Sequence, residues 1–213
     1  MTREGLESKE LAQALSKAYS SLEYHTGYLV PGEKAWLEDS GTTPPENWVT
    51  ASDRIQERII DRAGYKVGLI YFPKLIKGAK EPSAMMMKAV VRKAESLSKR
   101  SDIVIGISPW GGNAERTLLE KHTPQIHLLL GAGPGPGLAG RFARNGQTFW
   151  VRSYKRGKAV HVIHISKLPT RSNDWKWIKN GNISMKLEVL NQDLSEDADL
   201  VALLGKFTLP PPK

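Results

Sequence analysis

Three loops rich in glycine and proline follow segments that we predict to be strands or short elements of an α/β layer. They are residues 31–33, residues 108–113 and the run Gly-Ala-Gly-Pro-Gly-Pro-Gly at residues 131–137. In an open α/β sheet, ligands bind at the carboxyl ends of the strands, where loops and helix N-termini converge. Backbone N–H groups of a glycine-rich loop can approach an anion closely, so the third loop could cradle a phosphate. The residues we expect to face such an anion are Gly131, Gly133, Gly135 and Asn113, the last as the cap of a helix.

Other chemistries have little support in the sequence. The third loop lacks the Gly-Lys-Ser/Thr ending of a P-loop and its two prolines remove donors, so a tight loop without a ligand is the alternative. The five histidines are not at metal-ligand spacing with carboxylates, and His161 and His164 point to opposite faces of a predicted strand. There is no cysteine and no Gly-x-Ser-x-Gly motif, which excludes a catalytic thiol and argues against a serine hydrolase of that type.

Positive charge is concentrated in one part of the chain. The net charge is +9, yet the segment from Arg141 to Lys186 holds eleven basic residues and one acid. This segment predicts a surface for an anionic partner. We expect a basic patch formed by Arg141, Arg144, Arg152, Lys155, Arg156 and Lys158. Trp175 and Trp177 could stack on bases there, or they could instead cover the sheet as apolar packing, which we favour.

The elements that position these residues follow from hydrophobic periodicity. We predict helices at 8–22, 33–38, 83–99 and 113–121, and strands at 24–30, 53–60, 65–72, 103–107 and 125–130. Short strands and turns of antiparallel hairpin type follow from 141 to 190, and a last helix begins near Asp197. The 213 residues suit a single domain, with an α/β portion at 1–137, a basic hairpin portion at 138–192 and a C-terminal helix and tail at 193–213. No apolar run could span a membrane and no signal peptide is visible, which predicts a soluble protein.

The order of these loops and strands resembles the 5′-nucleotidase branch of the calcineurin-like metallophosphoesterases, over most of residues 11–204. That family has a strand ending in Gly-Asn-His-Glu, followed by strands that read roughly Lys-Val-Gly-Val-Ile-Gly, Asp-Val-Val-Ile-x-Leu-Ser-His-x-Gly and Ile-Asp-Leu-Ile-Ile-Gly-Gly-His-Ser-His. The corresponding stretches begin at Val30, Lys66, Asp102 and Ile126, and they read Val-Pro-Gly-Glu, Lys-Val-Gly-Leu-Ile-Tyr, Asp-Ile-Val-Ile-Gly-Ile-Ser-Pro-Trp-Gly and Ile-His-Leu-Leu-Leu-Gly-Ala-Gly-Pro-Gly. The resemblance implies an α/β sandwich of two mixed sheets flanked by helices, without the family's first strand.

The resemblance also implies where a catalytic site should be. The family hydrolyses phosphate esters with two divalent metal ions that are held by Asp, Asn and His ligands. At the matching positions this chain has Pro31, Gly32, Pro109, Gly133 and Gly135, and it retains Glu33 alone. Proline and glycine side chains offer no ligand atom, and the family's first two motifs would precede the first helix, where we expect the chain to begin too late. We therefore predict no catalytic residue, no metal ligand and no cofactor.

These observations lead to one preferred function and two alternatives. We expect a non-catalytic phosphoesterase-like domain that binds an anionic ligand or a protein partner. The alternatives are a basic module that binds nucleic acid or another polyanion, and a residual phosphohydrolase with a non-standard metal site. A missing first strand would expose a sheet edge, which predicts a homo-oligomer. The chain as written would be cytoplasmic, or periplasmic if it is a fragment of an exported protein.

Overall fold

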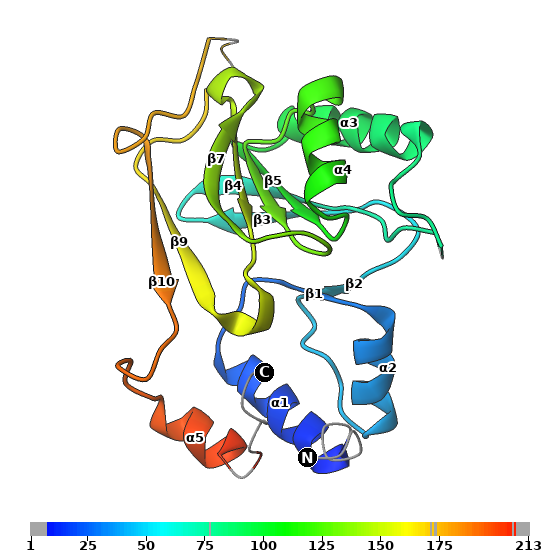
Figure 1. Cartoon of the computed structure of the whole chain (residues 1–213), viewed down its shortest axis with the longest axis vertical. Coiled ribbons are helices and arrows are strands. Elements are labelled where there is room, and N and C mark those ends of the chain that lie inside the picture. Colours follow the sequence, from blue (N-terminus) through cyan, green and yellow to red (C-terminus); the bar gives the residue numbers. More distant parts are fainter. Residues whose placement is uncertain (1–7, 77, 171, 173, 206, 208–213) are drawn as a thin grey trace. The chain divides into compact units, whose positions relative to one another are not determined.

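The computed structural model describes residues 8–76, 78–170, 172, 174–205 and 207 (Figure 1). The chain divides into two compact units. The smaller unit contains residues 1–51 and 192–213, and the larger unit contains residues 52–191. No helix among the described residues is both long and apolar enough to cross a membrane.

The larger unit is built on a mixed sheet that we call the main sheet. Among the described residues its strand order is β3-β4-β5-β6-β8-β7, with β4, β5, β6 and β8 parallel and the two edge strands antiparallel to their neighbours. The strands are β3 (Gln56–Arg62), β4 (Tyr65–Tyr71), β5 (Ile103–Ser108), β6 (Leu128–Gly131), β7 (Leu138–Ala143) and β8 (Thr148–Arg152).

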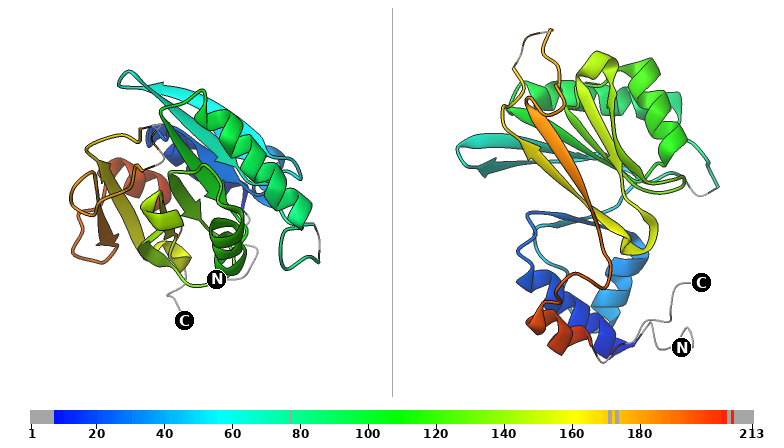
Figure 2. Two further views of the ribbon diagram at one scale, coloured as in Figure 1. Left: turned by 90° about the horizontal axis from the view of Figure 1, so that it is seen from above. Right: turned by 60° about the vertical axis from the view of Figure 1, so that its left-hand side comes forward.

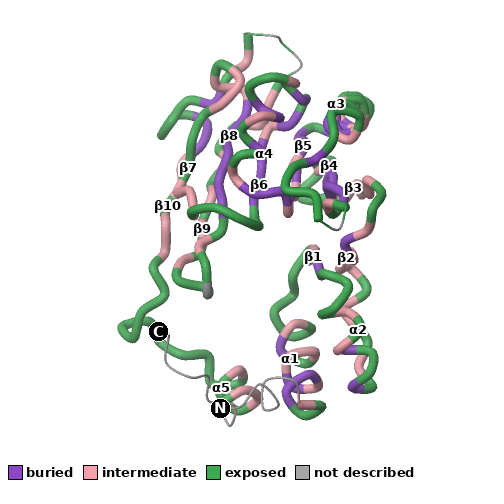
Figure 3. The backbone as a smooth tube through the Cα atoms, turned by 45° about the vertical axis from the view of Figure 1, so that its right-hand side comes forward, coloured by how far each residue is buried: buried purple, intermediate pink, exposed green. Residues whose placement is uncertain are grey.

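Burial along the strands agrees with this order. All five residues of β8 are buried, as expected for a central strand that is covered on both faces (Figure 3). The edge strand β3 has no fully buried residue. The positions of β5 and β6 within the sheet bring their carboxyl ends to the same edge, and the loops that follow them start there.

Helices cover one face of the main sheet (Figure 2). They are α3 (Ala84–Ser98), α4 (Gly112–Thr117) and the π-helical turn η2 (Leu118–His122). Helix α3 begins where the Ser83 hydroxyl accepts a hydrogen bond from Met86 N–H, and it buries Val90, Ala94 and Leu97 against the sheet. Since apolar residues recur at helical spacing, the sequence predicts this face of α3 correctly.

The other face of the main sheet packs against a two-stranded antiparallel sheet. Its strands are β9 (Ala159–Ile165) and β10 (Ile183–Val189), which are paired with the register Ile183 to Ile165. Trp177 lies 4% exposed in the core between these layers, and its Nε1–H donates to the carbonyl of His127 at 2.8 Å. Trp177 is therefore apolar packing, as we favoured. Short 3-10 turns η3 (Arg144–Gly146) and η4 (Lys155–Gly157) flank β8.

The smaller unit combines both ends of the described chain. It contains α1 (Lys9–Ser21), β1 (Gly27–Leu29), α2 (Pro31–Asp39), β2 (Trp48–Thr50) and α5 (Ala198–Leu204). Strands β1 and β2 pair in parallel, and Ala12, Leu29 and Leu37 form its buried core. Side chains cap two of its helices: Ser8 accepts from Leu11 N–H, and Asp197 accepts from Asp199 N–H and Leu200 N–H.

Most predicted elements are confirmed, with three differences. Strand β2 was not predicted, because residues 48–50 are too few to show a period. Helix α4 begins at Gly112 with Gly111 as its N-cap, so Asn113 is not the cap that we expected but an exposed residue of the first turn. The predicted boundary after residue 137 falls inside the main sheet, because β7 and β8 pair with each other and β8 pairs with β6. The single-domain description and the oligomer through a sheet edge stay predictions.

Candidate functional site

Two of the three predicted loops meet at the carboxyl edge of the main sheet. Ala132 N–H donates to the carbonyl of Ser108 at 2.8 Å, and Gly112 N–H donates to the carbonyl of Pro134 at 3.0 Å. These bonds join the loop after β5 to the loop after β6. The expected convergence of loops at this edge is present for residues 108–112 and 131–136.

Gly133 is fixed as glycine by this close contact. Its φ is +74°, a backbone conformation that side chains rarely adopt. A Cβ atom built on Gly133 would overlap the carbonyl oxygen of Pro109. The position that the resemblance gives to a metal-binding histidine therefore has no room for a side chain.

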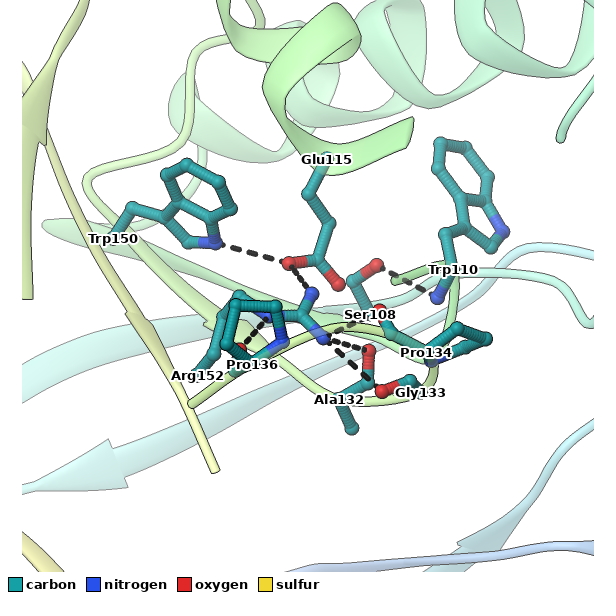
Figure 4. Close-up of polar contacts among 9 residues, drawn as sticks. All are labelled: Ser108, Trp110, Glu115, Ala132, Gly133, Pro134, Pro136, Trp150 and Arg152. Atoms are coloured by element: carbon teal, nitrogen blue, oxygen red, sulfur yellow. Dashed lines mark hydrogen bonds and ion pairs between the residues drawn. The ribbon is translucent and has the colours of Figure 1, made fainter. Parts of the chain in front are cut away.

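The guanidinium of Arg152 lies beneath the loop that follows β6 (Figure 4). Arg152 is the last residue of β8, and it is 3% exposed. Its Nε donates to the carbonyl of Pro136 at 3.1 Å, and its Nη2 lies 3.0–3.1 Å from the carbonyls of Ala132, Gly133 and Pro134. The loop thus presents carbonyl oxygens to a cation that belongs to the protein.

A buried carboxylate balances this cation. Glu115 of α4 is fully buried, and its Oε2 accepts from Arg152 Nη1 at 2.6 Å and from Trp150 Nε1 at 3.0 Å (Figure 4). Burial raises the pKa of Glu115 above its usual value, and the opposing effects are the charge of Arg152 and hydrogen bonds from Trp150, Arg152 and Ser108. We call Arg152, Glu115, Trp150 and the carbonyls of residues 132–134 and 136 the arginine network.

The geometry of the arginine network limits the chemistry available at this edge. Each nitrogen of the guanidinium has a protein acceptor and the residue is only 3% exposed, so the group is not presented to a phosphate or carboxylate of a substrate. The anion cradle of Gly131, Gly133, Gly135 and Asn113 stays a prediction. The loop's carbonyl groups at 132–134, however, face a cation, which is the opposite of what an anion needs.

A divalent metal ion fits this position poorly. Pro109, Gly133 and Gly135 supply no side-chain ligand, and the nearby carbonyls already accept from Arg152. The guanidinium would also repel a second cation placed beside these carbonyls. Within the part of the chain that the structure describes, no cluster of three or more His, Cys, Asp or Glu side chains has the arrangement of a metal site.

The remaining predicted positions belong to the smaller unit. Pro31 and Gly32 are exposed residues of the first turn of α2. The carboxylate of Glu33 accepts a hydrogen bond from Val30 N–H at 3.0 Å, which stabilises the start of this helix. Glu33 thus has a structural role in its own unit.

The predicted basic patch is wrong in one important member. Arg152 is buried and ion-paired, so it contributes no positive charge to the surface. Arg144 is half-buried, whereas Arg141, Lys155 and Lys158 are exposed, and the side chain of Arg156 lies outside the described part. The sequence showed the charge of Arg152 but not its partner, which is 37 residues away in the chain.

Sequence reasoning missed Glu115, although a signal was present. Glu115 shares the apolar face of its helix with Ala114, Leu118 and Leu119, which are all buried. Arg152 likewise follows the apolar run Phe149-Trp-Val. One acid and one base, each in an apolar segment, are a reasonable signal for a buried ion pair, because neither charge is stable there alone.

Comparison with solved structures shows the fold. The sequence matches no protein-family model and no curated protein at a significant level. The structure is similar to that of a Staphylococcus aureus protein assigned as a 5′-nucleotidase, which was solved with alpha-ketoglutarate, with a TM-score of 0.54 and 13% identity. The match covers 95% of this chain and 45% of that protein.

A second similar structure is the NAD nucleotidase of Haemophilus influenzae, with a TM-score of 0.60 and 13% identity. The match covers 93% of this chain and 47% of that protein, so the chain spans less than half the length of either one. The predicted resemblance is thereby confirmed at the level of the fold. The chain has the calcineurin-like metallophosphoesterase fold in the form seen in these nucleotidases.

Proposed function

We propose that the chain is a phosphoesterase-like domain without phosphoesterase activity, in which the Arg152 guanidinium replaces metal ions as the positive charge beneath the loops. The observation that supports this proposal is the arginine network. It places a buried, ion-paired guanidinium beside Gly133, where the resemblance requires a histidine ligand. A permanent organic cation can hold the loop carbonyls together, but unlike a metal ion it cannot lower the pKa of a water molecule to make a nucleophile.

The arginine network holds separate segments of the larger unit together. Arg152 joins β8, α4 and the loop of residues 132–136, which are three separate segments of the larger unit. In an active enzyme of this fold, the charge at the carboxyl edge serves both stability and chemistry. Here the protein's own ion pair provides the stability, and we infer that the chemistry has been lost.

The test is a phosphatase assay on the full 213-residue chain. The substrates are AMP, NAD⁺ and bis(p-nitrophenyl) phosphate, each with Mn²⁺, Mg²⁺, Zn²⁺ or EDTA. The expected result is that phosphate from AMP, AMP from NAD⁺ and nitrophenol from the diester are each released no faster than in buffer with the same metal ion.

Glu33 allows a sharp control, since it is the retained residue of the resemblance. Metal-dependent hydrolysis that disappears in Glu33→Gln but persists in Asp39→Asn would overturn the proposal. Asp39 is a matched control because it is an exposed acid of the same helix and its replacement removes the same charge. Binding of Mn²⁺ at micromolar concentration, measured by electron paramagnetic resonance, would also contradict it.

A further inference from the structure

A cavity of about 490 Å³ lies at the other edge of the main sheet. Its walls include residues that precede β5 and β6, such as Asp102, Gln125 and His127, as well as Arg144 and Trp175. Its residue Gln147 directly precedes β8, whereas Arg152 ends that strand, and the five residue steps between them span about 16 Å. This cavity is therefore separate from the arginine network, and an inference about it is independent of the proposed function. Its volume lies within the range of small-molecule sites.

Arg144 brings a poorly compensated positive charge to this cavity. Its Nη1 and Nη2 donate to neutral acceptors over long distances, 3.4 Å to Thr148 Oγ1 and 3.2 Å to Gln147 Oε1. Its Nε is buried and has no acceptor among the described residues, and no described carboxylate lies within ion-pair distance. Burial lowers the pKa of Arg144, which reflects the cost of desolvating this charge. An anion in the cavity would supply the charged acceptor that the guanidinium lacks among the described residues.

The backbone holds Arg144 in an unusual conformation. Arg144 and Asn145 have φ values of +52° and +54°, in the left-handed region that residues other than glycine seldom adopt. The turn is kept in place from the neighbouring segment, since Trp177 N–H donates to the carbonyl of Gly146 at 2.8 Å. Strain of this kind is retained where surrounding contacts enforce it, and it is enriched at binding sites.

Aromatic rings form the wall of the cavity beside this charge. The Nδ1 of His127 accepts from Val104 N–H at 2.9 Å, so the proton of the neutral ring is on Nε2. Trp175 meets the His127 ring edge-on, with centroids 6.0 Å apart, and meets Trp177 edge-on at 4.5 Å. The two contacts fix the orientation of the half-buried Trp175 indole, which offers a flat apolar surface to a ligand.

Two carboxylates in the same wall restrict the charge of a ligand. Glu95 is paired with Lys99 at 3.1 Å, and Asp102 Oδ2 accepts from Lys66 N–H at 2.7 Å. Together with Lys99 and Arg144, these two carboxylates leave the described wall without net formal charge, so a doubly charged phosphate would add more uncompensated negative charge than a singly charged carboxylate. We propose that this cavity binds a small aromatic carboxylate, whose anionic group pairs with Arg144 and whose ring packs on Trp175.

Calorimetric titration of the full chain with phenylacetate tests the proposal. Phenylacetamide has nearly the same shape without the charge, and we expect it to bind at least about tenfold more weakly, because a charge-assisted hydrogen bond contributes about 1.5–3 kcal/mol. We expect phenyl phosphate, a dianion near neutral pH, to bind more weakly than phenylacetate. These comparisons use the unchanged protein, so they do not depend on the folding of a variant.

Variants then assign the two contacts. Arg144→Gln and Trp175→Leu are each expected to weaken phenylacetate binding by about tenfold. Arg141→Gln is the matched control, because it removes the same charge from an exposed residue that does not line this cavity. This variant should bind phenylacetate with unchanged affinity. The shift of the Trp175 indole N–H in an NMR titration should saturate with the same dissociation constant.

Four results would overturn the proposal. The first is no phenylacetate binding at about 10 mM, which corresponds to less than roughly 3 kcal/mol of binding free energy. The second and third are equal affinity for phenylacetamide and tighter binding of phenyl phosphate. The fourth is an Arg144→Gln variant that binds phenylacetate as tightly as the unchanged protein does.

Discussion

Replacing Arg152 by methionine tests whether the buried ion pair stabilises the larger unit. Methionine keeps much of the apolar stem but removes the guanidinium, which leaves Glu115 fully buried without its cation. Breaking one side of a buried pair usually costs about 3–5 kcal/mol. The carbonyls of residues 132–134 lose their donor too, but these residues are exposed, so their carbonyls can turn to water at little cost.

Protonation of Glu115 limits how much stability the Arg152→Met variant can lose. Without Arg152 the largest opposing influence is gone, so the raised pKa of Glu115 should rise further. The unfolded carboxyl has a pKa of about 4.3, and holding it neutral at pH 7 costs about 3.7 kcal/mol. Because the folded pKa exceeds the unfolded one, this penalty is absent below about pH 4. It grows by about 1.4 kcal/mol for each pH unit until the folded pKa is reached.

The measurement is urea unfolding of Arg152→Met and the unchanged chain between pH 5 and pH 7.5, followed by circular dichroism. Adding Glu115→Gln to the variant should remove the pH dependence and restore part of the stability, since Gln can still accept from Trp150 Nε1. Arg141→Met, an exposed control, should change stability by less than about 0.5 kcal/mol. Equal stability of Arg152→Met and the unchanged chain at pH 7, or a loss that neither varies with pH nor responds to Glu115→Gln, would refute the reasoning.

Three further predictions concern single side chains. Burial and the charge of Arg144 lower the pKa of His127 to about 4, so the free energy of unfolding should fall by about 3 kcal/mol as the pH drops from 6.5 to 4. His127→Asn keeps an acceptor for the Val104 N–H, and in urea titrations this variant should lack that part of the fall. Gly133→Ala should lower the free energy of unfolding by about 2 kcal/mol or more, whereas Gly32→Ala should not, because the space around Gly32 is open. Equal thermal midpoints of the two variants would contradict this prediction. Trp110→Phe should lower the free energy of unfolding by about 1–3 kcal/mol, because the buried carbonyl that accepts from the Trp110 indole loses its donor. An unchanged thermal midpoint would argue against that hydrogen bond.

Local patterns in the sequence were sufficient for much of the fold. The apolar runs of β4 and β5, the amphipathic face of α3 and the loops after β5 and β6 were all predicted, because each depends on residues close together in the chain. The placement of β8 between β6 and β7 was not, since it depends on pairing across the sheet. As a result, β7 and β8 were assigned to a separate hairpin portion.

The candidate site shows the same limit more strongly. At Pro109, Gly133 and Gly135 the sequence itself shows residue types whose side chains have no ligand atom. What fills the position could not be predicted, because Arg152 and Glu115 come together through the packing of α4 on the main sheet. We counted the charged residue at the end of β8 as surface charge. A charge that is buried beside an opposite charge contributes to the interior instead.

The division of the chain has a consequence for the order in which it folds during synthesis. The larger unit, residues 52–191, is continuous, so all of its strands are available once residue 191 has left the ribosome. In the smaller unit, α5 packs on α1 and is synthesised after the larger unit. The contact between α1 and α5 must therefore wait until residue 204 has left the ribosome, whereas the buried core of Ala12, Leu29 and Leu37 lies within the N-terminal segment of the smaller unit. A stalled chain in which a flexible linker replaces the residues from 198 on, long enough to bring residue 191 outside the ribosome, should carry a protease-resistant larger unit.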